Sequence, residues 1–137
     1  MKGKAFKFGD NISTDHIAPG RLFHLRSDLQ EFAKHVLEDA DENFAKNMNK
    51  GDFVVAGNNF GLGSSREHAP QIIKIAGVGA VIAKSFARIF YRNAINIGLL
   101  AIECDTDGID AGDELDLDIK AGTLKNLTKG TITAIEP

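Results

Sequence analysis

The residues best suited to chemistry lie in a glycine-rich run at 61–67, GLGSSRE. Gly61 and Gly63 permit backbone conformations closed to other residues and leave room for a ligand to approach. Ser64 adds a hydroxyl group, and Arg66 adds a planar guanidinium that can bind a carboxylate through two parallel hydrogen bonds. A helix starting after this turn would direct unpaired N–H groups at the same place. The run therefore predicts a site for a carboxylate or a phosphate.

The same run has a purely structural interpretation. Glu67 follows Ser64 by three residues, which is the spacing of a capping box that only closes the start of a helix. A passive anion-binding module is a further alternative, because a helix start holds an anion without any catalysis. On these residues alone, all three interpretations stay open.

The surrounding sequence predicts the elements that position this run. Apolar residues 53–56 form a strand before it, and a helix continues to about residue 76 after it. Earlier in the chain we expect a strand over 1–8 and a long loop over 10–27. A helix over 29–38, capped by Asp28, and a helical turn near 42–48 follow. Strand 78–83, helix 85–96 and strand 99–103 come later. Short alternating runs at 113–119, 123–127 and 131–135 predict antiparallel hairpins.

These elements predict an α/β fold with a mixed sheet, flanking helices and a C-terminal hairpin region. The chain has 137 residues, 43% hydrophobic and 26% charged, which fits a single domain over 1–137. A net charge of −3 argues against a nucleic-acid partner. We expect a cytoplasmic protein without a membrane partner, because no apolar stretch approaches ~20 residues and residues 1–6 lack the apolar run of a signal peptide.

The sequence contains one cysteine, Cys104. It cannot form a disulfide within the chain, and one thiolate cannot hold an iron–sulfur cluster. Its apolar neighbours predict a buried structural thiol. His24 and His35 lack partners at metal-ligand spacing, so we expect no metal site in this chain.

Three blocks, at 61–70, 13–21 and 83–98, resemble the swivel domain of the aconitase superfamily, in the form found in isopropylmalate dehydratase small subunits. The resemblance covers nearly the whole chain and implies an aconitase-type swivel fold. It implies a hydro-lyase subunit acting on a hydroxy di- or tricarboxylate, most closely an isopropylmalate dehydratase of leucine biosynthesis. Homoaconitase and 2,3-dimethylmalate dehydratase small subunits are the alternatives.

The resemblance also implies roles for individual residues. Ser64 would be the base that removes a proton next to a carboxylate, and Asp15 would assist proton transfer at the leaving hydroxyl. Arg66 would bind a substrate carboxylate, with Ser65 and Gly63 beside it. The [4Fe–4S] cluster would lie in a large partner subunit and not in this chain.

A loop arginine would bind the distal carboxylate of the substrate. Arg26 is the candidate, and Arg21, which follows a Pro-Gly step and could brace the loop, is the alternative. The loop 21–27, RLFHLRS, departs from the Tyr-Leu-Arg-Thr pattern of many isopropylmalate dehydratases. The sequence therefore leaves the substrate open. We expect Arg88, Tyr91, Arg92 and Asn93 to serve in structural pairing or in contact with the large subunit.

Overall fold

A computed structural model describes residues 1–64 and 67–135. Over these residues the chain forms a seven-stranded sheet in the order β4-β3-β2-β1-β5-β6-β7. The strands are β1 (Lys2–Lys7), β2 (Phe53–Ala56), β3 (Ala80–Ala83), β4 (Ala101–Glu103), β5 (Glu114–Asp118), β6 (Thr123–Asn126) and β7 (Thr131–Ala134). Strands β1 to β4 are parallel, whereas β5 to β7 pair antiparallel. The predicted mixed sheet and C-terminal hairpins are confirmed.

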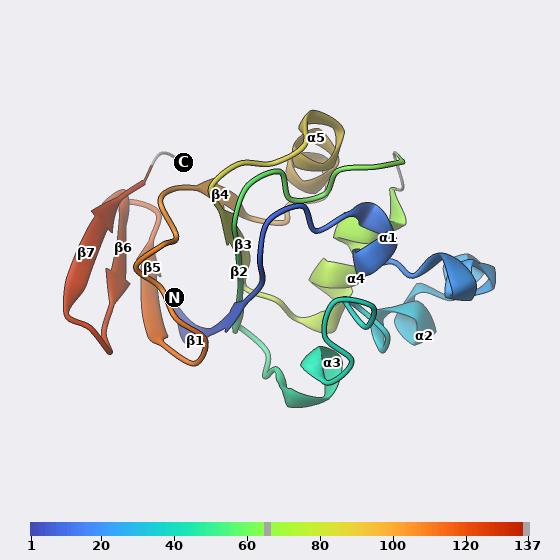
Figure 1. The fold of residues 1–137 in the computed structure, drawn as a ribbon, viewed down its shortest axis with the longest axis horizontal. Coiled ribbons are helices and arrows are strands. Elements are labelled where there is room, and N and C mark those ends of the chain that lie inside the picture. Colours follow the sequence, from blue (N-terminus) through green and yellow to red (C-terminus); the bar gives the residue numbers. More distant parts are fainter. Residues whose placement is uncertain (65–66, 136–137) are drawn as a thin grey trace.

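Strand β1 belongs to both parts of the sheet. Its first half, from Lys2 to Lys4, pairs antiparallel with β5, and its second half, from Ala5 to Lys7, pairs parallel with β2. Figure 1 shows the antiparallel strands at one end of the molecule and α1, α2 and α4 at the other.

The parallel strands are buried on both faces, as their continuous apolar sequences predict. Val54 and Ala56 of β2 face a core shared with the helices. Phe53 and Val55 alternate with them and face a second core, to which the antiparallel strands contribute Leu115, Leu117 and Leu124. The hairpin region therefore covers the sheet face that the helices leave open.

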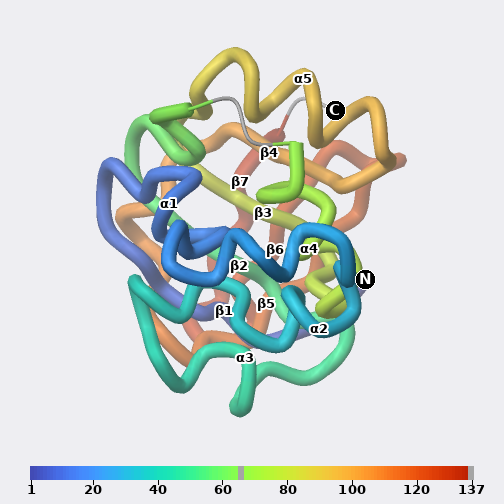
Figure 2. Tube along the Cα trace, turned by 90° about the vertical axis from the view of Figure 1, so that its right-hand side faces the viewer, coloured from blue at the N-terminus to red at the C-terminus, as the bar shows by residue number. Residues whose placement is uncertain are grey.

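The helices are α1 (Thr14–Ile17), the 3-10 helix η1 (Gly20–Ser27), α2 (Leu29–Ala33), α3 (Phe44–Asn47), α4 (His68–Ala76) and α5 (Arg88–Asn96). Figure 2 shows α1, α2 and α4 in front of the sheet, with α5 above and α3 below. Asp28 caps α2 as predicted, because its carboxylate accepts from the Glu31 N–H at 3.2 Å. Among the described residues, no helix is long and apolar enough to cross a membrane.

Some element predictions were wrong in part. The helix expected over 29–38 ends at Ala33, because the following residues form turns in which Leu37 has a positive φ of 56°. The segment 10–27, expected as a loop, contains α1 and η1. α1 has only four residues, and η1 buries none of its residues, so neither gives the sequence a regular apolar period. The helix expected over 85–96 starts only at Arg88, since residues 85–87 pair instead with Phe60, just before the glycine-rich run.

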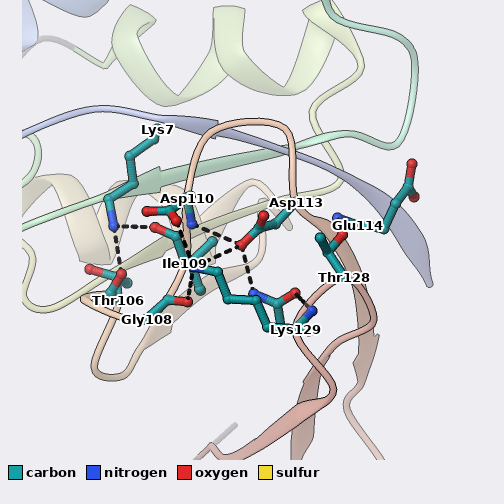
Figure 3. Close-up of polar contacts among 10 residues, drawn as sticks. Lys7, Thr106, Gly108, Ile109, Asp110, Asp113, Glu114, Thr128 and Lys129 are labelled. Atoms are coloured by element: carbon teal, nitrogen blue, oxygen red, sulfur yellow. Dashed lines mark hydrogen bonds and ion pairs between the residues drawn. The ribbon is translucent and has the colours of Figure 1, made fainter.

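Two lysines hold the segment between β4 and β5 (Figure 3). Lys7 Nζ donates to the carbonyls of Thr106 and Ile109 at 2.5 and 2.6 Å. Lys129 Nζ donates to the Gly108 carbonyl at 2.8 Å and lies 2.7 Å from an Asp110 carboxylate oxygen. The segment is thereby fixed to both the parallel and the antiparallel parts of the sheet.

Candidate functional site

The glycine-rich run lies where the parallel strands end. Residues 57–64 follow β2 and run between the segment after β1 and the segment after β3. Gly61 N donates to the Ile12 carbonyl at 2.7 Å on one side. Phe60 N donates to the Ser85 carbonyl at 3.0 Å on the other. Ligands of open α/β sheets commonly bind at the carboxyl ends of parallel strands, so this position suits a site.

Both glycines of the run are required by its backbone. Gly61 has φ +87°, and a Cβ there would lie 2.3 Å from the Phe90 ring, so a side chain cannot fit. Gly63 has φ +106°, a conformation that side-chain-bearing residues rarely adopt. At Gly61 the missing side chain makes room for the Phe90 ring of α5, whereas the expectation that the glycines leave room for a ligand stays a prediction.

A cavity of about 270 Å³ opens beside the run. Thr14, Gly61, Gly63 and Ser64 form one wall. The opposite wall is the start of α5, from Ala87 to Phe90, together with Asn93. Ser64 is exposed, so its hydroxyl is accessible to a small molecule in this cavity.

Ser64 does not start a helix. Helix α4 begins at His68, its cap residue is Glu67, and no side chain caps it. The capping-box interpretation of Ser64 and Glu67 is therefore wrong. The capping box in this region joins Ser13 and His16 instead: Ser13 N donates to His16 Nδ1 at 2.9 Å, and His16 N donates to Ser13 Oγ at 3.2 Å.

Asp15 lies in the first turn of α1, beside this cap. It is exposed, and its carboxylate accepts from the Gly20 N–H at 3.0 Å. The preceding residue, Thr14, is buried and donates its hydroxyl to the Ser64 carbonyl at 2.9 Å. The structure thus brings the two sequence-predicted catalytic residues onto adjacent, hydrogen-bonded segments.

The two loop arginines are held away from this cavity. Arg21 forms ion pairs with Glu38 at 2.6 Å and Asp39 at 2.9 Å. These carboxylates raise the pKa of Arg21, and the Arg21 hydrogen bond in turn lowers the pKa of Glu38. Arg26 stacks over the Phe23 ring at 4.8 Å and donates to the Phe23 carbonyl at 3.0 Å. Ser65 and Arg66 lie outside the described residues.

The residues of this chain do not fit an iron–sulfur cluster. Burial, and secondarily the nearby Asp105, raises the pKa of the half-buried Cys104 thiol to about 11. A metal-binding cysteine must be a thiolate, which this environment disfavours. His35 pairs with Glu38 at 2.6 Å, and the described residues contain no group of three or more metal-ligating side chains.

Sequence reasoning missed Thr14 and the wall formed by α5. Thr14 stands in the 13–21 block, but only the fold shows that its hydroxyl holds the Ser64 segment. Arg88 and Asn93 belong to the 83–98 block and were expected in structural or partner contacts, whereas the structure places them in the cavity wall. The resemblance of the 83–98 block to the aconitase swivel domain was the sequence signal that could have indicated this position.

Residues 10–107 match the aconitase C-terminal domain family, so this chain belongs to that family. The match includes α1, the glycine-rich run and α5, and the sequence-based resemblance to the superfamily is confirmed.

Several curated relatives of this chain are 3-isopropylmalate dehydratase small subunits. The 3-isopropylmalate dehydratase small subunit 1 of Thermotoga maritima is 69% identical over 131 residues, 95% of this chain and 79% of its own. Small subunit 2 of Archaeoglobus fulgidus is 64% identical over 137 residues, 100% and 83% of the two chains. A crystal structure of 3-isopropylmalate dehydratase from Methanocaldococcus jannaschii superposes with a TM-score of 0.93 at 49% identity, covering 98% of this chain and 79% of that one.

Proposed function

We propose that this chain is the small subunit of a 3-isopropylmalate dehydratase, a hydro-lyase of leucine biosynthesis completed by a large subunit. The observation that carries the proposal is the exposed Ser64 in a cavity at the ends of the parallel strands, joined through Thr14 to the segment that bears Asp15. The names of relatives at 52–69% identity support the substrate over the homoaconitase and dimethylmalate alternatives.

In this proposal Ser64 removes the proton from the carbon next to a substrate carboxylate. The electron pair of that C–H bond forms the double bond while the hydroxyl on the adjacent carbon leaves as water. Rehydration runs the same steps in reverse with the opposite regiochemistry. Asp15 assists proton transfer to the departing hydroxyl.

A neutral serine hydroxyl is a weak base, so Ser64 can accept the proton only if its alkoxide form is stabilised. A nearby guanidinium favours the charged form of an oxygen acid, so we assign Arg66 two tasks: it binds a substrate carboxylate and it favours the Ser64 alkoxide. Ser65 and Gly63 would donate to, or make room for, the same carboxylate. Arg26, or Arg21 as the alternative, would bind the distal carboxylate after the loop rearranges around substrate and partner.

The [4Fe–4S] cluster belongs, in this proposal, to the large subunit. We expect a cytoplasmic heteromer in which the small subunit alone is inactive, because the acid–base groups and the cluster lie on different chains.

Reconstitution tests the proposal. The purified chain should bind no stoichiometric iron and show no turnover, and adding a large subunit that carries a cluster should produce conversion between 2- and 3-isopropylmalate. The unsaturated diacid formed between them can be followed by its ultraviolet absorption. Turnover by the isolated chain would refute the two-subunit reading. Binding of simple carboxylates with no turnover in the assembled complex would instead favour the anion-binding module.

A further inference from the structure

The cavity beside Ser64 has a second wall for which the proposed mechanism has no role. This wall is the start of α5, where Arg88 and Ile89 lie next to each other in the cavity lining. Both side chains are exposed, and Ile89 keeps 46% of its surface accessible. A cation and an apolar group therefore face the space that the Ser64 hydroxyl faces.

Arg88 differs from the loop arginines in its partners. Arg21 is held by Glu38 and Asp39, and Arg26 by Phe23. Within the part of the chain that the structure describes, the Arg88 side chain has no hydrogen bond and no ion pair. A guanidinium without a carboxylate partner beside a candidate base suits a ligand that brings its own carboxylate.

Ile89 differs in the same way from the apolar residues of the 21–27 loop. Leu22 and Leu25 are partly buried and pack on the main core, and Phe23 contacts Arg26 and His68. These three side chains already pack against other residues of the chain. Ile89 instead adds branched aliphatic surface to the cavity itself.

We infer that the start of α5 is a substrate-binding wall of the site, in which Arg88 binds a carboxylate and Ile89 contacts the alkyl substituent of the substrate. The inference rests on the proposed function and extends it, because it assigns substrate choice to α5 as well as to the 21–27 loop. The ligand it fits is a hydroxy diacid with a branched alkyl group.

Helix α5 supplies a matched control for each residue. Arg92 and Ile95 are exposed on the same helix, Ile95 by 54%, but neither lines the cavity. Arg88→Gln and Arg92→Gln each remove one charge, and Ile89→Ala and Ile95→Ala each remove the same aliphatic groups. A difference in kcat/KM between the two variants of a pair is therefore due to the position in the cavity and not to the loss of a side chain from the helix.

The experiment measures kcat and KM of the four variants, assembled with the large subunit, for 3-isopropylmalate and for 3-methylmalate. Arg88→Gln should lower kcat/KM by about ten- to a hundredfold for both substrates, since both keep the two carboxylates. Ile89→Ala should lower kcat/KM about tenfold for 3-isopropylmalate and change it little for 3-methylmalate. With the large subunit at saturation, so that any contact of Arg92 with it is not limiting, Arg92→Gln and Ile95→Ala should leave both values near wild type.

Titration with the large subunit separates substrate binding from assembly. The inference is overturned if the members of either pair behave alike, or if saturating large subunit restores the Arg88 or Ile89 variant to the wild-type rate. A wild-type complex that turns over neither substrate would refute the proposed function itself. An active wild type with unaffected Arg88 and Ile89 variants would refute only the role of α5.

Discussion

The Thr14 hydroxyl donates a hydrogen bond of 2.9 Å to the Ser64 carbonyl. Thr14 N also donates to the Leu62 carbonyl at 2.8 Å, so one residue fixes two points of the glycine-rich run. Because Thr14 is 3% exposed, water does not compete strongly for these bonds. The position of Ser64 is thus set by the residue that precedes Asp15.

Thr14→Val keeps the shape of the side chain and removes the hydroxyl. We expect a loss of about 1 kcal/mol in the free energy of unfolding and a lower kcat, because the Ser64 segment is no longer held against α1. Thr106→Val is the matched control, since Thr106 is buried and donates to the Ala56 carbonyl at 2.7 Å outside the site. It should cost similar stability and leave kcat unchanged. Denaturant titration measures the stability of the two variants, and kinetics of the assembled enzyme measures their kcat. Equal kcat values for Thr14→Val and Thr106→Val would show that the Thr14 hydrogen bond has only a structural role.

Ser64→Ala should reduce kcat by about two to four orders of magnitude, because it removes the proposed proton acceptor. Stability should stay near wild type, since Ser64 caps no helix. Ser13→Ala provides the contrast: it removes the cap of α1 and should cost about 1 kcal/mol of stability. A Ser64→Ala complex with half the wild-type rate would rule out Ser64 as the base.

Arg26→Lys keeps the charge but loses the planar fork. If Arg26 binds a distal carboxylate in the assembled enzyme, kcat/KM should fall by about tenfold or more for substrates that carry this carboxylate. Analogues with a methyl group in its place should be affected little. The comparison is with Arg21→Lys, because the guanidinium of Arg21 forms ion pairs with Glu38 and Asp39. Uniform losses across the substrates would mean that Arg26 only supports the loop.

Asp113 gives the fold a pH dependence in acid. Its carboxylate accepts from Asp110 N at 2.9 Å and from Asn126 Nδ2 at 2.8 Å and lies 3.4 Å from Lys129 (Figure 3). The backbone bond from Asp110 first, and then Asn126 and Lys129, hold the pKa of Asp113 below its ordinary value. Its stabilisation is therefore complete above the unfolded pKa, near ~4, and is lost as the pH falls through the lower folded pKa.

Asp113→Asn should accordingly cost about 1–2 kcal/mol at pH 7, and the difference from wild type should shrink as the pH is lowered below about 4. Thermal unfolding at several pH values measures this difference. The control is Glu114→Gln, an exposed neighbour that should leave the curve unchanged. A constant difference between Asp113→Asn and wild type down to pH 2 would contradict the assignment.

Strand β2 was predicted to the residue, because four consecutive apolar residues stand between Gly51-Asp52 and Gly57. Asp28 was recognised as a cap for a similar local reason. The start of α4 was not, since bonds from Gly61 to residue 12 and from Phe60 to residue 85, both distant in sequence, hold the segment that precedes it.

In the candidate site, too, the features set by local sequence could be predicted and those set by distant segments could not. Ser64 and Asp15 could be named as candidates because each stands in a motif. The link through Thr14 and the opposing wall on α5 could not, because both depend on which segments the sheet order brings together.

The double pairing of β1 has a consequence for how the protein folds. The N-terminal strand lies in the middle of the sheet and hydrogen-bonds to β2 on one edge and β5 on the other. Neither half has its full complement of ladder bonds without residues 2–7, and contacts between residues so far apart in sequence slow folding. The hairpin region and the part of the sheet that bears the candidate site are therefore coupled into one cooperative unit, and we expect a change that unpairs β5 from β1 to destabilise the parallel strands as well.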